Sequence, residues 1–310
     1  MRSTSISGLM VIVILCTPAT LTFGWGAATH TYLAKELGSQ QGITNLQEMY
    51  GAVLPDMFNM MFGYSYKEYL WNETHYEFMK VVEVATLPLT KSFVYGFASH
   101  NEEWGADHTA HGGYVTAKTD ILSPLLKTKI EDFLVAHGIS PDPILLDQLA
   151  SRIAHNSVES AVDLLVSQNE APYIGMHLLL AAKSRTPFIP TSLCKAYSKD
   201  FAYEAGISFR EATVILVKVE RQFKEYMELY GGILMQANAA DLMAVQGAKL
   251  AELILQKEYG ISVNVPPVLM KFCLNAAVLV VKNDYSDALA TTLSYVEEEL
   301  ENHGIQPVLF

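Results

Sequence analysis

The chain has 310 residues, half of them hydrophobic, which is enough to bury a sizeable core in one large domain or two small ones. Its 21 Lys and Arg residues against 33 Asp and Glu residues give a formal net charge of −12. Non-specific nucleic-acid binding depends on Lys and Arg at phosphates, so this charge argues against that class of protein. It does not exclude an anionic substrate, because bound metal cations invert the local field.

Residues 1–24 have the pattern of a secretory signal peptide. A basic start precedes the apolar stretch 8–16, which is too short to span a bilayer. Thr22 and Gly24 are the small residues expected before a cleavage site. We therefore expect cleavage near Gly24 and Trp25 and a mature chain that is secreted or periplasmic. The alternative is an uncleaved amino-terminal anchor.

The rest of the chain predicts helices almost throughout, because alternating strand patterns with hairpin turns are nearly absent. We expect an all-α fold, a multi-helix bundle with ligands projecting into the helical core. A single domain, 25–310, would comprise a motif-bearing part, 25–186, and a helical part, 187–310. The expected helices are 26–37, 46–53, 72–85, 92–111, 123–136, 143–168, an apolar helix around His177, 192–205, 208–230, 235–259 and 268–303.

The helix expected at 92–111 carries His100, Asp107 and His111. Offsets of seven and eleven residues return to within about 20° on an α-helix, so the three side chains would share one face. They are nitrogen and oxygen donors of the kind that bind zinc. A kink at Gly105 is compatible with the pattern, and Gly112 and its neighbouring glycine indicate the helix end.

The same ligand chemistry recurs elsewhere in the first half of the chain. His155 and Glu159 are four residues apart and share a helix face. Asp56 follows a proline at the end of a short helix, and His30 and His75 lie in predicted helices. Each of these residues alone has an ordinary explanation, such as a surface ion pair or a helix cap. Only the complete series indicates a metal site.

In its order and residue types this series resembles the zinc-dependent phospholipase C family, which shares an α-helical fold and a trinuclear zinc site with the single-strand-specific zinc nucleases. Members of that family begin the mature chain with Trp, whose amino group and carbonyl bind zinc. A His, a Pro-Asp, a single His, a His–Asp–His helix and a His-x-x-x-Glu follow. The matching residues are Trp25, His30, Asp56, His75, His100, Asp107, His111, His155 and Glu159.

The resemblance implies three zinc ions. Trp25 and His30 would hold the first. Asp56, His75 and His100 would hold the second, with Asp107 bridging these two ions, and His111, His155 and Glu159 would hold the third. The resemblance spans 25–163. The helices after Pro187 are unmatched, and they complete the bundle, shape the substrate cleft or form an extension.

One position departs from the family pattern. Many members place the bridging Asp four residues after the first His of the helix, and that position is Trp104 here. The helical spacing favours Asp107. Glu103 is the alternative carboxylate, and His108 is a further candidate ligand.

The resemblance implies a secreted zinc-dependent phosphodiester hydrolase. We expect phospholipase C-like cleavage of a phospholipid head-group ester by a zinc-bound hydroxide, with Asp56 as the catalytic residue that orients or deprotonates the water. A phospholipid or another phosphodiester would be the substrate. Peripheral membrane contact fits this substrate, and we expect no stable nucleic-acid complex. The sequence does not define the oligomeric state.

Three alternatives remain at this point. A single-strand-specific zinc nuclease would need aromatic platforms for bases, for which the candidates are Tyr64, Tyr66, Tyr69, Trp71 and Trp104, although such side chains more often belong to the core or a cleft wall. A secreted zinc-binding protein without turnover would keep the same ligands. A di-iron carboxylate bundle is disfavoured, because it needs Glu-x-x-His on two helices.

Two cysteines, Cys194 and Cys273, follow the predicted cleavage site. Export would permit a disulfide between them. Because both lie in apolar helical stretches, two buried free thiols are an equal alternative.

Overall fold

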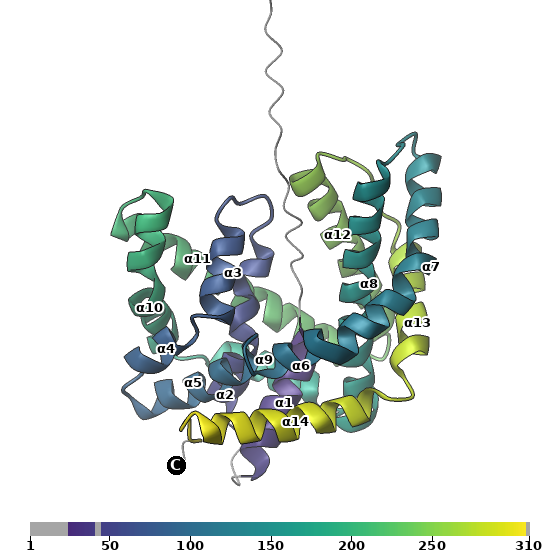
Figure 1. Ribbon diagram of the computed structural model, residues 1–310. Coiled ribbons are helices and arrows are strands. Elements are labelled where there is room, and N and C mark those ends of the chain that lie inside the picture. The colour runs from purple at the N-terminus through teal and green to yellow at the C-terminus, as the bar shows by residue number, and fades with distance from the viewer. Residues whose placement is uncertain (1–23, 41–44, 308–310) are drawn as a thin grey trace, which may run out of the picture.

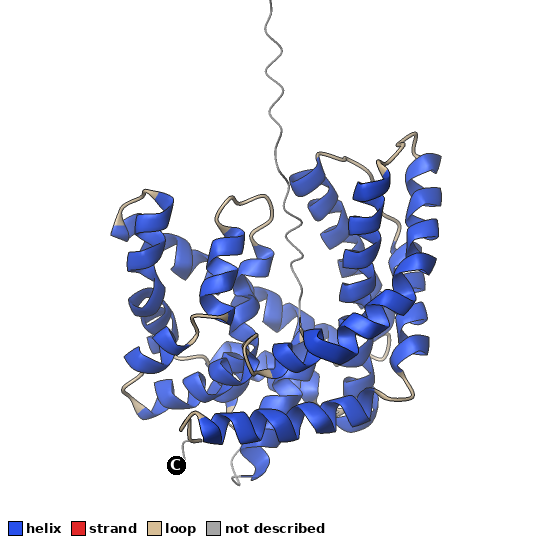
Figure 2. Ribbon diagram, viewed as in Figure 1, coloured by secondary structure: helices blue, strands red, loops and turns tan. Residues whose placement is uncertain are grey.

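The computed structural model describes residues 24–40 and 45–307, and this part of the chain is helical with short connections and no strand (Figure 1). Figure 2 shows the same all-helical character, which confirms that the fold is all-α. The predicted signal peptide lies outside the described residues except for Gly24. The α-helices are α1 (Ala27–Gln40), α2 (Leu46–Val53), α3 (Lys67–His75), α4 (Met79–Val84), α5 (Pro88–His100), α6 (Ala106–Thr109), α7 (Val115–Ala136), α8 (Pro143–Leu165), α9 (Ile174–Ser184), α10 (Phe188–Ala205), α11 (Phe209–Leu234), α12 (Ala239–Tyr259), α13 (Pro267–Val281) and α14 (Tyr285–Asn302).

Three further segments have tighter or wider helical turns. The 3₁₀ segment η1 (Leu54–Met60) follows α2. The π-helical segments η2 (Ala110–Tyr114) and η3 (Val166–Glu170) follow α6 and α8. Such π-helical segments often occur at functional sites, and η2 contains one of the candidate ligands, His111.

The helices form two groups that flank a central helix. In Figure 1, α7, α8, α12 and α13 stand together on the right, α3 and α10 stand on the left, and α11 runs from beside α10 behind the middle of the molecule. Helix α1 lies between them and contacts α2, α5, α8, α9 and α14, while α14 runs along the foot of the molecule. A cluster of buried apolar side chains extends from Trp25 to Ile305. The amino-terminal turn of α1 is buried in this core.

Local signals explain where several helices begin and end. The Asp142 carboxylate caps α8 by accepting hydrogen bonds from the backbone of Ile144 and Leu145 at 2.8 and 3.4 Å. Ser208 caps α11, with Glu211 completing a capping box. Gly206 ends α10 with a φ of 63°, a left-handed conformation that glycine adopts without a steric penalty.

Two glycines let α2 and α5 cross in backbone contact. A Cβ atom on Gly51 would lie 2.1 Å from the carbonyl oxygen of Phe93, and one on Gly96 would lie 1.9 Å from that of Glu48. No larger residue fits either position without moving the helices apart. This crossing sets the place of His100, the last residue of α5.

The helix expected at 92–111 is wrong, because α5 ends at His100. The Asn101 side chain accepts hydrogen bonds from the backbone N–H groups of the next turn, at Glu103, Trp104 and Gly105. The chain then resumes as α6, and η2 continues it into α7. The two glycines expected to end a helix instead lie inside η2.

Other boundaries also differ from expectation. The helix expected at 72–85 is divided into α3 and α4, and the one expected at 268–303 is broken between α13 and α14. Pro124 lies inside α7 rather than in a first turn, because α7 begins already at Val115. The apolar helix around His177 is present as α9.

Neither Cys194, which is half-buried, nor Cys273, which is buried, forms a disulfide. Free thiols, the second of the two alternatives, are therefore observed, although only Cys273 is fully buried. Among the described residues, no helix combines the length and apolar character needed to cross a membrane.

Candidate metal centre

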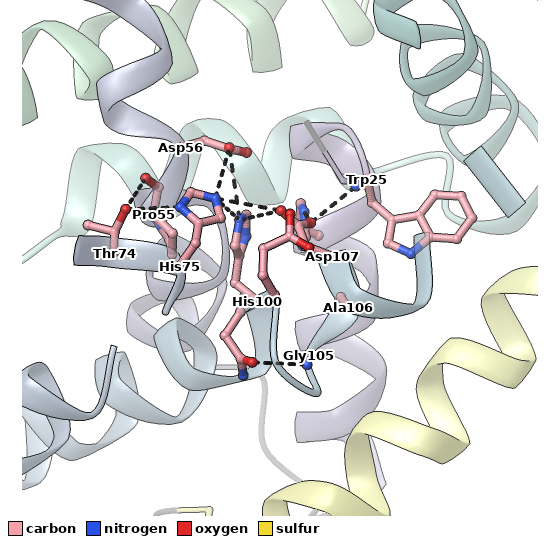
Figure 3. Close-up of polar contacts among 12 residues, drawn as sticks. Trp25, Pro55, Asp56, Thr74, His75, His100, Gly105, Ala106 and Asp107 are labelled. Atoms are coloured by element: carbon pink, nitrogen blue, oxygen red, sulfur yellow. Dashed lines mark hydrogen bonds and ion pairs between the residues drawn. The ribbon is translucent and has the colours of Figure 1, made fainter. Parts of the chain in front are cut away.

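The buried carboxylate of Asp107 lies at the middle of the candidate site (Figure 3). Its Oδ1 atom lies 3.0 Å from Nε2 of His30 and accepts a hydrogen bond of 3.3 Å from the backbone nitrogen of Trp25. Its Oδ2 atom lies 3.0 Å from Nε2 of His100 and 3.6 Å from Nε2 of His75. Each oxygen of this carboxylate therefore faces a different set of candidate ligands.

Backbone carbonyls hold the imidazoles of His75 and His100 in place. Nδ1 of His75 lies 2.9 Å from the carbonyl oxygen of Trp71, and Nδ1 of His100 lies 2.8 Å from that of Ala52. A carbonyl only accepts hydrogen bonds, so both Nδ1 atoms donate and both Nε2 atoms are left for another role. The two Nε2 atoms lie 3.2 Å apart, a geometry that a shared cation or an extra proton must stabilise.

Asp56 completes the first group of ligand atoms. It lies in η1 directly after Pro55, and its Oδ1 atom is 3.7 Å from Nε2 of His75 and 3.9 Å from Nε2 of His100. The amide of Asn59 donates a 2.6 Å hydrogen bond to the same oxygen. Ligand atoms of Asp56, His75, His100 and Asp107 all lie within 4.8 Å of one another.

A second group of ligand atoms joins η2 to α8. It comprises His111, His155 and Glu159, again within 4.8 Å of one another. Nε2 of His155 lies 2.9 Å from Oε1 of Glu159, as the four-residue spacing predicts. The structure thus brings His111 of η2 together with the two residues of α8.

Glu102 belongs to this site but was missed by the sequence analysis. Its Oε1 atom lies 2.5 Å from Nδ1 of His111, and a carboxylate behind a histidine is a common way to orient a metal ligand. Its carboxylate also forms a third group with Asp107 and His111. No spacing rule points to Glu102. It lies in the turn after α5, whereas the sequence predicted a continuous helix through this position.

Asp163 anchors the start of α1 beside the site and was also missed. Its carboxylate accepts hydrogen bonds from the backbone nitrogens of Ala28 and Thr29 at 3.1 and 2.7 Å. It also accepts from Oγ1 of Thr29 at 2.7 Å and from the hydroxyl of Tyr230 at 2.9 Å. This bonding fixes the backbone next to Trp25 against α8. Its position four residues after Glu159, on the same helix face, is the signal that could have found it.

The backbone before Trp25 also touches the centre. A Cβ atom on Gly24 would lie 1.6 Å from Oδ1 of Asp107, so a side chain at this position would displace the carboxylate. Trp25 itself is buried, and its ring stacks on Tyr114 at 5.6 Å. The peptide at the expected cleavage point therefore lies directly against Asp107.

The pKa shifts of the site reflect two opposing causes, burial and the charges of neighbouring site residues. Burial alone would lower the pKa of His100, but Asp107 and Asp56 outweigh it and raise that pKa to about 9. Burial alone would raise the pKa of Asp107, but His100 and His30 hold it well below its usual range. Burial, together with Asp56, raises the pKa of Glu159 well above its ordinary value.

Nε2 of His30, Oδ2 of Asp107 and Oε1 of Glu159 are buried, and each has an ion-pair partner at 2.9 to 3.0 Å but makes no well-aligned hydrogen bond. Buried polar atoms are rarely left in this state. All three belong to side chains that meet at the centre, and a bound cation would satisfy them. Nitrogen and oxygen donors of this kind fit zinc.

Two predicted alternatives lie outside the groups of ligand atoms. Glu103 and His108 are exposed. Nδ1 of His108 is 3.2 Å from the carbonyl oxygen of Glu102, and its ring stacks on Tyr295. Asp107 rather than Glu103 is therefore the carboxylate between the two histidine sets.

A pocket of about 150 Å³ opens beside the centre. Trp25, Asp56 and Glu159 line it together with other residues of η1 and α8, and side chains of α11 and α12 complete the lining, among them Tyr226 and Leu250. The carboxy-terminal helices, which the sequence could not assign, thus shape a pocket at the site.

The aromatic side chains suggested as base-stacking platforms have other contacts. Trp71 stacks on His75 at 4.0 Å, and Tyr69 stacks on Phe201 at 6.5 Å. Trp104 is buried and stacks on His303. None of the five candidates is among the residues that line the pocket beside the centre.

Comparisons of this chain with protein-family models, with curated proteins and with solved structures found no match.

Proposed function

We propose that this protein is a zinc-dependent phosphodiester hydrolase that cleaves a phospholipid head-group ester. The observation that carries the proposal is the position of Asp107, whose two oxygens face Trp25 and His30 on one side and the pair of histidines on the other. A carboxylate in this position suits a bridge between two cations. The group formed by η2 and α8 provides a further set of ligands within the same site.

The donor set suggests the following assignment. Trp25 and His30 would hold one zinc ion, and Asp56, His75 and His100 a second, with Asp107 shared between them. His111, His155 and Glu159 would hold the third. When bound, zinc supplies a Lewis acid for phosphoryl oxygens and lowers the pKa of a coordinated water.

Asp56 is the residue best suited to proton transfer. Its side chain is 13% exposed and lines the pocket, whereas Asp107 is fully buried. The hydrogen bond from Asn59 fixes one carboxylate oxygen and leaves the other to orient a water or accept its proton. Glu102 and the backbone carbonyls behind the histidines keep the ligands oriented without touching the substrate.

The pocket favours a lipid over a nucleic acid. Beyond the carboxylates of Asp56, Glu159 and Asp163 its walls are largely apolar, with Met60, Phe223 and Ile254 among them. It contains no lysine or arginine to hold successive phosphates of a polynucleotide. The single-strand-specific nuclease keeps one supporting observation, because Tyr226 and Tyr230 line the pocket with rings stacked at 6.3 Å.

Hydrolysis by the zinc-loaded mature protein tests this proposal. Release of phosphocholine from phosphatidylcholine should exceed release of nucleotides from single-stranded DNA. Asp56→Ala should lower kcat/KM for any cleaved phosphodiester by about 100-fold or more, because it removes both a ligand and the proton acceptor. Glu103→Gln, an exposed change in the adjoining turn, should leave the rate intact.

Two results would oppose the proposal in different ways. A preference for single-stranded DNA would keep the zinc hydrolase and replace the lipid with a nucleic acid. Bound zinc without cleavage of lipid, DNA or bis(p-nitrophenyl) phosphate would identify a zinc-binding protein without turnover.

A further inference from the structure

We propose that an apolar channel between α8 and α12 holds one acyl chain of the phospholipid while the phosphodiester lies at the metal centre. The proposal rests on the hydrolase function above and assigns the part of the substrate that the metal ligands do not contact.

Two adjacent cavities make up the proposed channel. The first is the pocket beside the centre, which Asp56 and Glu159 line. The second, of about 120 Å³, lies farther along α8 and is closed by α12 and α13. The two cavities are adjacent, because they share six lining residues, and we take them together as one channel. The shared residues are Asn156, Ser160, Tyr226, Tyr230, Leu250 and Ile254.

The second cavity has the chemistry of a hydrocarbon site. Its walls are mainly apolar, including Leu149, Met243, Ala244 and Leu274. The charged residue in this lining, Arg152, is paired with Glu258 of α12, so its charge is compensated. The lining thus provides no uncompensated charge for a phosphate, and it removes apolar surface from water.

The length of the channel matches an acyl chain. It follows α8 from Ser160 to Leu149, which are eleven residues apart and therefore about 16 Å apart along the helix axis. One leaflet of a bilayer has a hydrocarbon layer of about 15 Å, half of the bilayer core. An acyl chain reaching from the centre to Leu274 on α13 would thus be covered for most of its length.

Because the candidate ligands Asp56 and Glu159 line the first cavity, an occupant of the channel must carry its apolar chain beside a phosphodiester. A phospholipid has this arrangement. A nucleotide strand does not, because its next phosphate would enter the apolar part of the channel. The channel therefore selects among the substrates that the metal centre alone would accept.

The experiment measures binding and hydrolysis against chain length. Alkylphosphocholines with four to ten carbons, each below its micelle concentration, are titrated into the zinc-loaded protein by calorimetry. Phosphatidylcholines with short acyl chains are assayed for kcat/KM under the same condition. We expect both affinity and kcat/KM to rise with each added methylene, by at most about fourfold, since burying one CH₂ contributes about 0.8 kcal/mol. The heat-capacity change of binding should become more negative in step.

A filled channel provides the matched variant. Gly247 of α12 lines the second cavity, and a Cβ atom there would lie 3.5 to 3.8 Å from atoms of Met270, an ordinary contact. Gly247→Leu should fill the cavity and remove the gain from added methylenes. The control is Gly232→Leu in α11, where a Cβ atom meets nothing within 4 Å. The control should keep the full chain-length dependence.

Circular dichroism and zinc content establish that both variants are folded. Hydrolysis of bis(p-nitrophenyl) phosphate by the unaltered protein separates this inference from the function on which it rests. If that ester is cleaved but affinity and kcat/KM are indifferent to chain length, the channel is wrong and the hydrolase stands. If no phosphodiester is cleaved but alkyl binding still depends on chain length and on Gly247, the channel stands and the hydrolase is wrong. Retention of the dependence in Gly247→Leu would also overturn the channel.

Discussion

At the residue scale, the imidazoles of His75 and His100 are oriented by hydrogen bonds from the ring nitrogen that faces away from the centre. The carbonyls of Trp71 and Ala52 take the Nδ1 protons of His75 and His100 and leave the Nε2 atoms facing each other. The sequence named these residues as candidate ligands from their order and types, and the structure brings them together. Their orienting partners were not predictable, since Glu102 and the carbonyls contact the ligands only after the helices are packed.

Away from the centre, Glu48 provides a test of burial. It is a fully buried carboxylate in α2, and burial raises its pKa from 4.5 to about 8. Between these pH values the folded chain holds a proton on Glu48 that the unfolded chain has lost. The contribution of this group to stability therefore falls as the pH rises from about 4.5 to about 8, and ionised Glu48 is most unfavourable above that range.

Glu48→Gln should remove this dependence, because the amide stays neutral. We expect the free energy of unfolding of the variant relative to the unaltered protein to increase by up to about 1.4 kcal/mol per pH unit across that range. Urea unfolding at pH 5, 7 and 9 measures it. Parallel pH profiles for the two proteins would show that Glu48 is ionised in the folded state throughout.

At the element scale, periodicity predicted most helices but not the interruptions that position ligands. The spacing of His100, Asp107 and His111 suits a straight helix, yet the chain turns at Asn101 and brings the same residues together from α5, α6 and η2. The turn depends on one side-chain amide oxygen that accepts three backbone hydrogen bonds. A side-chain hydrogen bond of this kind does not alter the spacing of apolar residues, so the hydrophobic pattern cannot predict it.

The crossing of α2 and α5 yields a second test at this scale. Alanine is the better helix former, but a Cβ atom on Gly96 would lie 1.9 Å from the carbonyl oxygen of Glu48. Gly96→Ala should therefore lower the free energy of unfolding by about 2 kcal/mol or more and weaken zinc binding, because His100 ends the same helix. Chemical unfolding and zinc titration measure the two effects.

Gly232→Ala is the matched control for this change. It places the same methyl group on a helical glycine in open space. The control should be neutral or stabilising by up to about 1 kcal/mol. Equal behaviour of the two variants would mean that the α2–α5 crossing can relax at little cost.

At the scale of the whole molecule, the centre depends on segments far apart in the chain. The backbone at Trp25 meets Asp107, Asp163 of α8 holds the first turn of α1, and Tyr226 of α11 closes the pocket. The sequence predicted the amino-terminal part of this arrangement through the ligand series. The role of α11 and α12 was not predictable, because their apolar patterns are those of any core helix and only the packed structure reveals the pocket they line.

Zinc content of the mature protein is the most direct test of the centre. The protein is produced with Trp25 as its first residue and again with one residue added before it, and bound zinc is measured by elemental analysis after dialysis. About three zinc ions per chain are expected when Trp25 is the first residue, and fewer when its amino group is blocked. A protein without zinc, or the same zinc content with and without the added residue, would contradict the proposed ligand set.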